Sequence, residues 1–124
     1  MQLNHLHLSV SDVPVCAHVF ARHFGFTELE SSSNGGFSVL TNPDGFVLVL
    51  MRHAKDVDPE RAYPSQFHVG FLIRDESHVT GLHADMKADG LHVSELEFSR
   101  GARRFYCRIS SGIVVEVGHN PDVR

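Results

Sequence analysis

The chain has 124 residues and a mass of 13.8 kDa, which allows one compact domain, or two very small modules that share a core, and excludes a long multidomain enzyme. Apolar residues make up 42% of the chain and charged residues 21%, with a mean hydropathy of −0.11, so the composition is that of a globular protein. The net charge of −4 and the pI near 6.2 argue against nucleic acid or an anionic membrane as a partner.

The sequence predicts a cytoplasmic protein with reduced thiols. No run approaches the roughly 18 consecutive apolar residues of a membrane-spanning helix, and the first ten residues lack the basic and apolar regions of a signal peptide. Cys16 and Cys107 are isolated from each other and form no CxxC motif. We therefore expect both cysteines to be small core residues in a reducing compartment.

The first half of the chain has the pattern of a strand, a helix and three further strands. Residues 3–10 alternate between two faces, which is typical of a strand. Asp12 and Pro14 predict the start of a helix and Gly25 its end. Strands are expected near residues 26–30, 36–41 and 46–51, separated by turn sequences. We assign residues 1–52 to a first βαβββ module and the polar residues 53–64 to a connector.

The second half repeats this pattern. The interval from His68 to Asp75 equals that from His5 to Asp12. A helix ending at Gly90 follows, and then strands near residues 92–98, 104–109 and 113–118, with Ser110-Ser111-Gly112 as the last turn. Residues 65–120 are thus a second βαβββ module. The predicted fold class is α+β, with two modules that together form one domain and a cup-shaped, mostly antiparallel sheet.

The repeat pairs four positions that matter for chemistry. His5 corresponds to His68 on the first strands, and Val49 corresponds to Glu116 on the last strands. Two similar units commonly associate about a pseudo-twofold axis, and this arrangement would bring all four positions near one centre. Three of the four positions hold potential metal ligands.

Glu116 needs a partner because it lies in an apolar strand, where an unpaired carboxylate is costly. Arg104 or Arg108 on the neighbouring strand is one candidate. A divalent cation bound by His5, His68 and Glu116 is the other. Two imidazoles and one carboxylate leave coordination positions open, which favours Fe(II), with Mn(II), Zn(II) or Ni(II) as alternatives.

Several neighbouring residues are candidates for supporting roles. His7 shares a strand face with His5 and is a candidate ligand, acid/base or substrate donor, or a polar lining residue without chemistry. Tyr106 precedes Glu116 by ten residues and is a candidate to bind or protonate an oxygen, or a half-buried strand aromatic. The four arginines of residues 100–108 either attract an anionic substrate or, as we favour, line a solvated edge strand.

Five short motifs, in this order and spacing, resemble the vicinal oxygen chelate superfamily, which includes glyoxalase I, bleomycin-resistance proteins and extradiol dioxygenases. The resemblance covers residues 3–118, and its carriers are Leu3-Asn4-His5-Leu6-His7-Leu8, Phe24-Gly25-Phe26, Asn42-Pro43-Asp44-Gly45, Gln66-Phe67-His68-Val69-Gly70 and Gly112-Ile113-Val114-Val115-Glu116. It implies paired modules around a divalent metal, a small oxygen-rich substrate bound through neighbouring oxygens, and a homodimer, in which modules are sometimes exchanged between chains.

The departures from the family pattern favour one branch over others. Glyoxalase I-like members usually carry a carboxylate ligand where this chain has Val49, so that activity is disfavoured. The spacing of Tyr106 and Glu116 resembles extradiol dioxygenases, although their acid/base histidine is missing near residues 97–99. Oxygenase chemistry is therefore expected ahead of a fosfomycin-resistance-like thiol transferase. A non-catalytic drug- or metabolite-binding protein of the bleomycin-resistance type is the remaining alternative.

Overall fold

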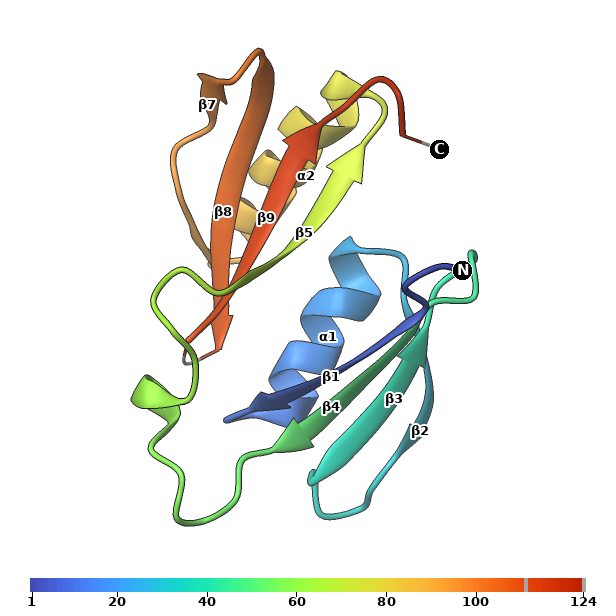
Figure 1. Ribbon diagram of the computed structural model, residues 1–124, viewed down its shortest axis with the longest axis vertical. Helices are drawn as coiled ribbons and strands as arrows, with labels where there is room; N and C mark the ends of the chain where they lie inside the picture. The colour runs from blue at the N-terminus through green and yellow to red at the C-terminus, as the bar shows by residue number, and fades with distance from the viewer. Residues whose placement is uncertain (111, 124) are drawn as a thin grey trace. The chain divides into compact units, whose positions relative to one another are not determined.

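The computed structural model describes residues 1–110 and 112–123, so Ser111 of the expected last turn lies outside the described residues. The chain divides into two compact units, Met1–Ala62 and Tyr63–Arg124. Each unit has its own sheet, and one helix lies against one face of that sheet (Figure 1). None of the described helices is long and apolar enough to cross a membrane. That the two modules form one domain stays a prediction.

The first unit has the predicted βαβββ order. Its elements are β1 (His5–Val10), α1 (Val13–His23), β2 (Thr27–Ser31), β3 (Phe37–Thr41) and β4 (Val47–Arg52), and the connector contains a short 3-10 helix, η1 (Pro59–Arg61). The sheet order is β1-β4-β3-β2; β1 runs parallel to β4, and the other pairs are antiparallel.

The helix of this unit begins and ends where the sequence predicted. The Asp12 carboxylate accepts a hydrogen bond from the Val15 backbone N–H at 3.1 Å, which satisfies one of the free donors of the first turn. Gly25, just beyond the helix, has a φ of +75°. One side of α1 packs on the sheet, and the core between them consists of Leu8, Val10, Cys16, Val19, Phe20, Leu40, Leu48 and Leu50.

The second unit repeats this arrangement with one more strand. Its elements are β5 (His68–Ile73), α2 (Glu76–Ala88), β6 (His92–Val93), β7 (Glu97–Ser99), β8 (Ala102–Ser110) and β9 (Ile113–His119). The sheet order is β5-β9-β8-β6, and β7 also pairs with β8; β5 runs parallel to β9. Its core lies under α2 and consists of Val79, Leu82, Met86, Phe105, Cys107, Ile113, Val115 and Val117.

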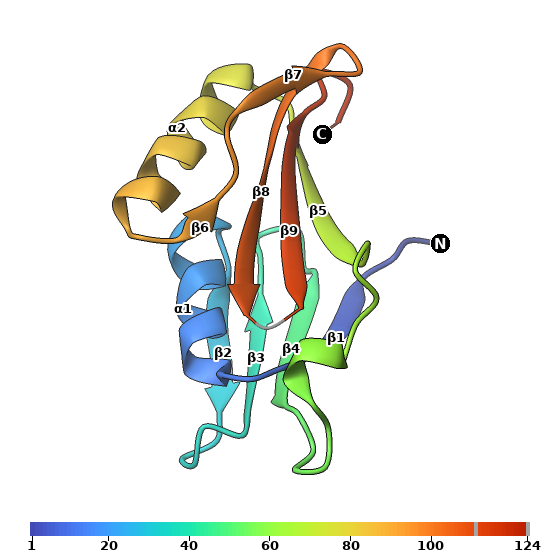
Figure 2. The ribbon, with the colours of Figure 1, turned by 90° about the vertical axis from the view of Figure 1, so that its left-hand side faces the viewer.

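The strand expected near residues 92–98 is divided into β6 and β7, two short segments beside β8 (Figure 2). Ser94 causes the interruption, because its hydroxyl accepts from the Tyr106 backbone N–H at 2.9 Å and so replaces a backbone acceptor of the ladder. The hairpin from β7 to β8 turns at Arg100 and Gly101, which both have positive φ, 52° and 76°. A two-residue turn with positive φ at both residues matches the twist of the two strands, but arginine rarely adopts a positive φ.

The strand registers confirm the internal repeat. In the first unit His7 lies opposite Val49, and in the second Gly70 lies opposite Glu116. Since both pairs join the first strand of a unit to its last strand, Val49 and Glu116 hold equivalent positions. The α+β fold and the two modules are therefore present, with a mostly antiparallel sheet in each unit.

Candidate metal centre on the open sheet faces

The candidate ligands of the second unit lie on the face of the sheet that α2 does not cover. In β8 and β9 the residues that face α2 are buried, whereas Arg104, Tyr106 and Glu116 alternate with them. Tyr106 lies directly opposite Glu116 in the register, and His68 starts the neighbouring strand β5. The spacing of ten residues therefore does place the Tyr106 and Glu116 side chains together.

The Glu116 carboxylate has contacts at both of its oxygens. Oε1 accepts from Arg104 Nη1 at 2.8 Å and from the Tyr106 hydroxyl at 3.2 Å. Oε2 lies 3.3 Å from His68 Nε2. The side chains of Glu116 and Arg104 are only 17% and 15% exposed, whereas that of His68 is 47% exposed. The arginine partner left open by the sequence is therefore Arg104, and it occupies one oxygen only.

Gly70 makes room for this arrangement. It lies opposite Glu116 on β5, and a Cβ atom at this position would be 3.7 Å from Glu116 Oε2. A longer side chain would compete with the carboxylate for the space above the strand. In the first unit the equivalent position holds His7, and there the partner on the last strand is Val49. At these two equivalent positions the first unit therefore has a histidine and a valine, and the second unit has a glycine and a glutamate.

The contact of His68 Nδ1 indicates which nitrogen of the ring carries the hydrogen in neutral His68. His68 Nδ1 lies 3.0 Å from the Gln66 carbonyl oxygen, which only accepts, so Nδ1 carries the hydrogen. In neutral His68 the Nε2 atom is then an acceptor that faces the acceptor Oε2 of Glu116. Two acceptors at 3.3 Å need a positive charge between them, either a proton on Nε2 or a bound cation.

The His5 ring in the first unit is held at Nδ1 in the same way. Its Nδ1 lies 2.7 Å from Asn4 Oδ1, which leaves Nε2 as the free nitrogen when the amide oxygen accepts. His5 and His7 are both exposed and alternate with Leu6 and Leu8, so they lie on the open face of the first sheet, as the sequence predicted. A hydrogen bond at Nδ1 is the usual way in which proteins orient a metal-binding histidine.

The donor types fit a divalent metal, although only two donors come together within one unit. Among the residues that the structure describes there is no group of three or more His, Cys, Asp or Glu side chains that could hold a metal ion. His68 Nε2 and Glu116 Oε2 are 3.3 Å apart, and two donors that share one ion at bond lengths near ~2.1 Å are about 3 Å apart. The separation of these two atoms is thus compatible with a shared ion, and His5, the third candidate ligand, belongs to the other unit.

The remaining arginines of residues 100–108 do not act as one basic patch. Arg103 contacts Glu76 at 3.5 Å, and its guanidinium lies over the Phe98 ring at 5.4 Å. Arg100 forms the hairpin turn, and Arg108 is exposed on the open face with Tyr106. Sequence reasoning missed Gln66 and Asn4 as orienting groups, although both lie within two residues of the histidines that they hold.

Comparisons with known proteins identify the family of this chain. Residues 2–117 match the model of a family described as the glyoxalase/bleomycin resistance protein/dioxygenase superfamily. No curated protein matches the sequence. A solved structure described as a possible glyoxalase from Bacillus cereus is 32% identical, covers 94% of this chain and 97% of its own, and superimposes with a TM-score of 0.79.

More distant structures share the fold alone. A glyoxylase/bleomycin resistance protein/dioxygenase domain from Frankia sp. EAN1pec is 17% identical, with 97% of this chain and 98% of that chain covered and a TM-score of 0.77. The fosfomycin resistance protein FosX from Mesorhizobium loti is 18% identical, with 96% and 92% covered and a TM-score of 0.75. Because the family match extends over nearly the whole sequence, and a third of the residues are shared over nearly all of one solved structure, the chain belongs to the glyoxalase/bleomycin resistance protein/dioxygenase superfamily.

Proposed function

We propose that the protein is a metal-dependent enzyme that binds a small oxygen-rich substrate at a centre formed by His5, His68 and Glu116. The observation that carries this proposal is the approach of His68 Nε2 to Glu116 Oε2 at 3.3 Å, with the far side of the imidazole held by a carbonyl oxygen. Fe(II) is the favoured ion, and Mn(II), Zn(II) and Ni(II) are the alternatives. His5 supplies the third ligand, from the same chain or from a second copy in a homodimer.

The bound ion would supply Lewis-acid chemistry, by polarising an oxygen of the substrate. The residues of the second unit supply the rest. The Tyr106 hydroxyl, which donates to Glu116 Oε1 at 3.2 Å, holds a proton beside the carboxylate and can transfer it to or share it with a substrate oxygen. Arg104 pairs with Oε1 of Glu116 and fixes the orientation of the carboxylate, so that Oε2 stays turned toward His68.

Oxygenase chemistry on a catechol-like compound is the reaction that we propose. The support is the pair of Tyr106 and Glu116, which face each other across β8 and β9. His7, on the open face of the first sheet, is the proposed acid/base in place of the histidine that this sequence lacks near residues 97–99. Addition of a thiol to an activated substrate is the alternative reaction at the same centre.

A second function is supported by a specific contact. The Arg104–Glu116 ion pair at 2.8 Å neutralises the carboxylate without a metal, as expected in a protein that only binds a drug or metabolite. The two functions differ in their dependence on metal. In a binding protein, affinity for the small molecule is unaffected by a chelator, and no turnover occurs.

The test is the affinity of the purified, untagged protein for Mn(II) and Fe(II), measured by calorimetry under anaerobic conditions. We expect about one ion per chain and at least a tenfold weaker affinity in Glu116→Gln and in His5→Gln. His5→Gln matters most, since His5 is exposed on the first strand of its unit and its replacement should leave the fold intact. The matched control is Glu97→Gln, on β7 of the same sheet.

Equal metal affinity in wild type, His5→Gln and Glu116→Gln would contradict the proposed centre. If metal binds as expected, oxygen uptake with Fe(II) across a panel of catechols tests the oxygenase step. Activity with Mn(II) and a thiol in its place would favour the transferase.

A further inference from the structure

A groove in the first unit lies on the opposite side of its sheet from His5 and His7. It runs between α1 and the edge strand β2 and has a volume of about 330 Å³. Its apolar walls include Pro14, Ala17 and Ala21, and its polar side chains include His18, Glu28 and Ser38. We name it the α1–β2 groove. It lies wholly within one unit, so its geometry does not depend on any contact between units.

The floor of the α1–β2 groove is polar where a core is expected. Ser38 is 1% exposed and is the only fully buried polar side chain among the described residues. Its hydroxyl donates to Glu28 Oε2 at 2.5 Å. Because the serine hydrogen is already used, the floor offers only acceptors to an occupant: the Glu28 oxygens and the lone pairs of Ser38.

The second unit shows what the repeat places at the same positions. By strand register Ser38 is equivalent to Phe105, and Glu28 is equivalent to Val93. Phe105 is fully buried, and its ring packs against His83 with a centroid distance of 4.9 Å. The first unit thus has a serine and a glutamate at the two positions where the second unit has apolar side chains. Packing does not require this substitution, which costs buried apolar area.

The rim of the groove is fixed by its own hydrogen bonds. The Ser32 hydroxyl oxygen accepts from the backbone N–H groups of Gly36 and Phe37 at 2.7 and 3.0 Å. A Cβ atom built at Gly35 would lie 3.5 Å from the Pro14 ring, so the loop after β2 rests on the first turn of α1. The groove is therefore formed before any ligand arrives, which reduces the cost of binding.

Glu28 is the one carboxylate among the described lining residues of the groove, and it is exposed to solvent. In the described part of the chain Glu28 makes the hydrogen bond to Ser38 and no ion pair with a lysine or arginine. His18, the other titratable side chain that lines the groove, lies on the exposed surface of α1. A ligand that enters the groove therefore meets one carboxylate, the serine and histidine side chains of the lining, and short apolar walls.

We propose that the α1–β2 groove binds a small organic cation, a primary ammonium or guanidinium group on a short apolar chain. The cationic head donates hydrogen bonds to Glu28, and the chain lies against Pro14, Ala17 and Ala21. The volume is at the lower end of the range for ligand pockets, about 300–1,000 Å³, which limits the occupant to a small molecule. This site is independent of the metal centre and of the function proposed for it.

The test uses n-butylammonium and n-butylguanidinium as probes, with n-butanol and butyrate as the neutral and anionic controls. Backbone amide shifts of the full chain, recorded by ¹H–¹⁵N NMR at low salt, report the binding position and affinity. We expect saturable shifts at residues of α1 and β2 with the two cations only, and an affinity at least about fivefold lower in Glu28→Gln. Glu30→Gln, on the same strand but not lining the groove, is the matched control.

A second variant tests the same site without changing Glu28, in case Glu28→Gln does not fold. Ala21 is exposed on α1, so Ala21→Leu fills the groove without disturbing the carboxylate or the core, and we expect it to abolish the shifts. The proposal is overturned if butanol produces the same shifts as butylammonium, if Glu28→Gln binds like Glu30→Gln, or if Ala21→Leu still binds. Absence of saturable shifts with both cations in wild type overturns it as well.

Discussion

The Arg104–Glu116 pair should stabilise the metal-free protein by an amount that a double-mutant cycle can measure. The atoms Nη1 and Oε1 are 2.8 Å apart, and the two side chains are 15% and 17% exposed. Exposed pairs contribute up to ~1 kcal/mol, and removal of one member of a buried pair costs about 3–5 kcal/mol. This pair lies between the two cases, so we expect a coupling energy of about 1–3 kcal/mol.

The cycle consists of Glu116→Gln, Arg104→Met and the double variant. Glu116→Gln leaves a largely buried guanidinium whose Nε already lacks an acceptor in the described part of the chain, with a 3.4 Å contact from Nη2 to the Ser99 carbonyl oxygen. At about 3–5 °C per kcal/mol for a chain of this length, this single variant should lower Tm by roughly 5–10 °C. The double variant should be more stable than the sum of the single losses predicts.

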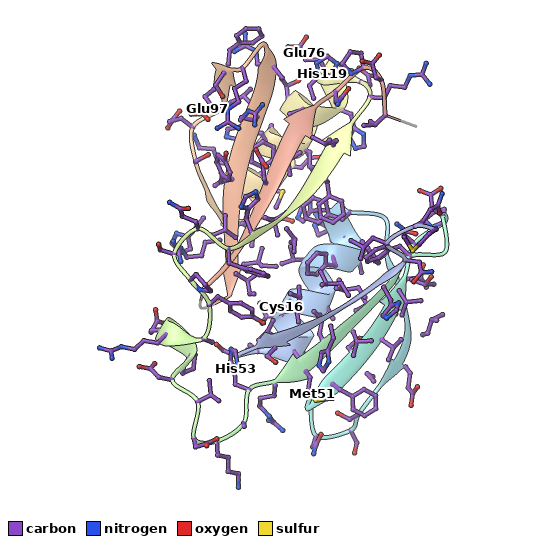
Figure 3. All side chains as sticks on the ribbon, viewed as in Figure 1. Cys16, Met51, His53, Glu76, Glu97 and His119 are labelled. Atoms are coloured by element: carbon purple, nitrogen blue, oxygen red, sulfur yellow. The ribbon has the colours of Figure 1, made fainter. Side chains whose placement is uncertain are left out.

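Urea unfolding followed by circular dichroism, with a chelator present, gives the four free energies of unfolding. The internal control is the Arg103–Glu76 pair at 3.5 Å, whose side chains are 43% and 50% exposed and whose coupling should stay below ~0.5 kcal/mol. Glu76 lies at the start of α2, at the same end of the unit as His119 (Figure 3). If the Arg104–Glu116 losses add within about 0.5 kcal/mol, the electrostatic role assigned to Arg104 is wrong.

Two further predictions concern groups away from the candidate centre. Burial raises the pKa of Cys107 to about 11, and Cys16 lies buried between α1 and its sheet (Figure 3), so a thiol reagent at pH 8 should label neither cysteine in the folded protein and both in urea. The Ser77 hydroxyl and backbone N–H lower the pKa of Asp75 from 3.8. The stability that this carboxylate contributes is present above pH ~4 and is lost as pH falls through the lowered pKa, so the Tm difference between wild type and Asp75→Asn should shrink below pH 4; a constant difference would contradict this.

The sequence was sufficient for the repeat and for the placement of most of the strand residues that it singled out. His5 and His68 begin equivalent strands because the same interval separates each from a helix-capping aspartate. Alternation placed Glu116 and Tyr106 on the same face. These features are local patterns of period two or of helical spacing, which depend little on packing.

The features that were missed depend on contacts between strands. The sequence offered Arg104 and Arg108 equally to Glu116, and both share its face. Arg104 lies opposite Gly118, which leaves space for the guanidinium to reach Glu116, whereas Arg108 lies opposite Val114. Spacing alone could not anticipate this choice.

The break in the strand near residues 92–98 had a similar origin. It depends on a hydroxyl that replaces a backbone partner, and serine in a strand does not by itself indicate this. The α1–β2 groove did have a signal in the sequence: Ser38 stands at an inward position of a strand whose other inward residue is Leu40.

The division of β6 from β7 has a consequence for behaviour at high concentration. An outer strand with a long, regular row of free N–H and C=O groups is a template on which foreign chains can polymerise. In the second sheet the edge beside β8 consists only of β6 and β7, which have two and three residues. In the first sheet the edge strand β2 carries a bulge between Glu28 and Glu30. The β2 edge and the β6–β7 edge therefore offer no continuous row of free backbone groups, so strand addition at these two edges is disfavoured; the opposite edges are β1 and β5.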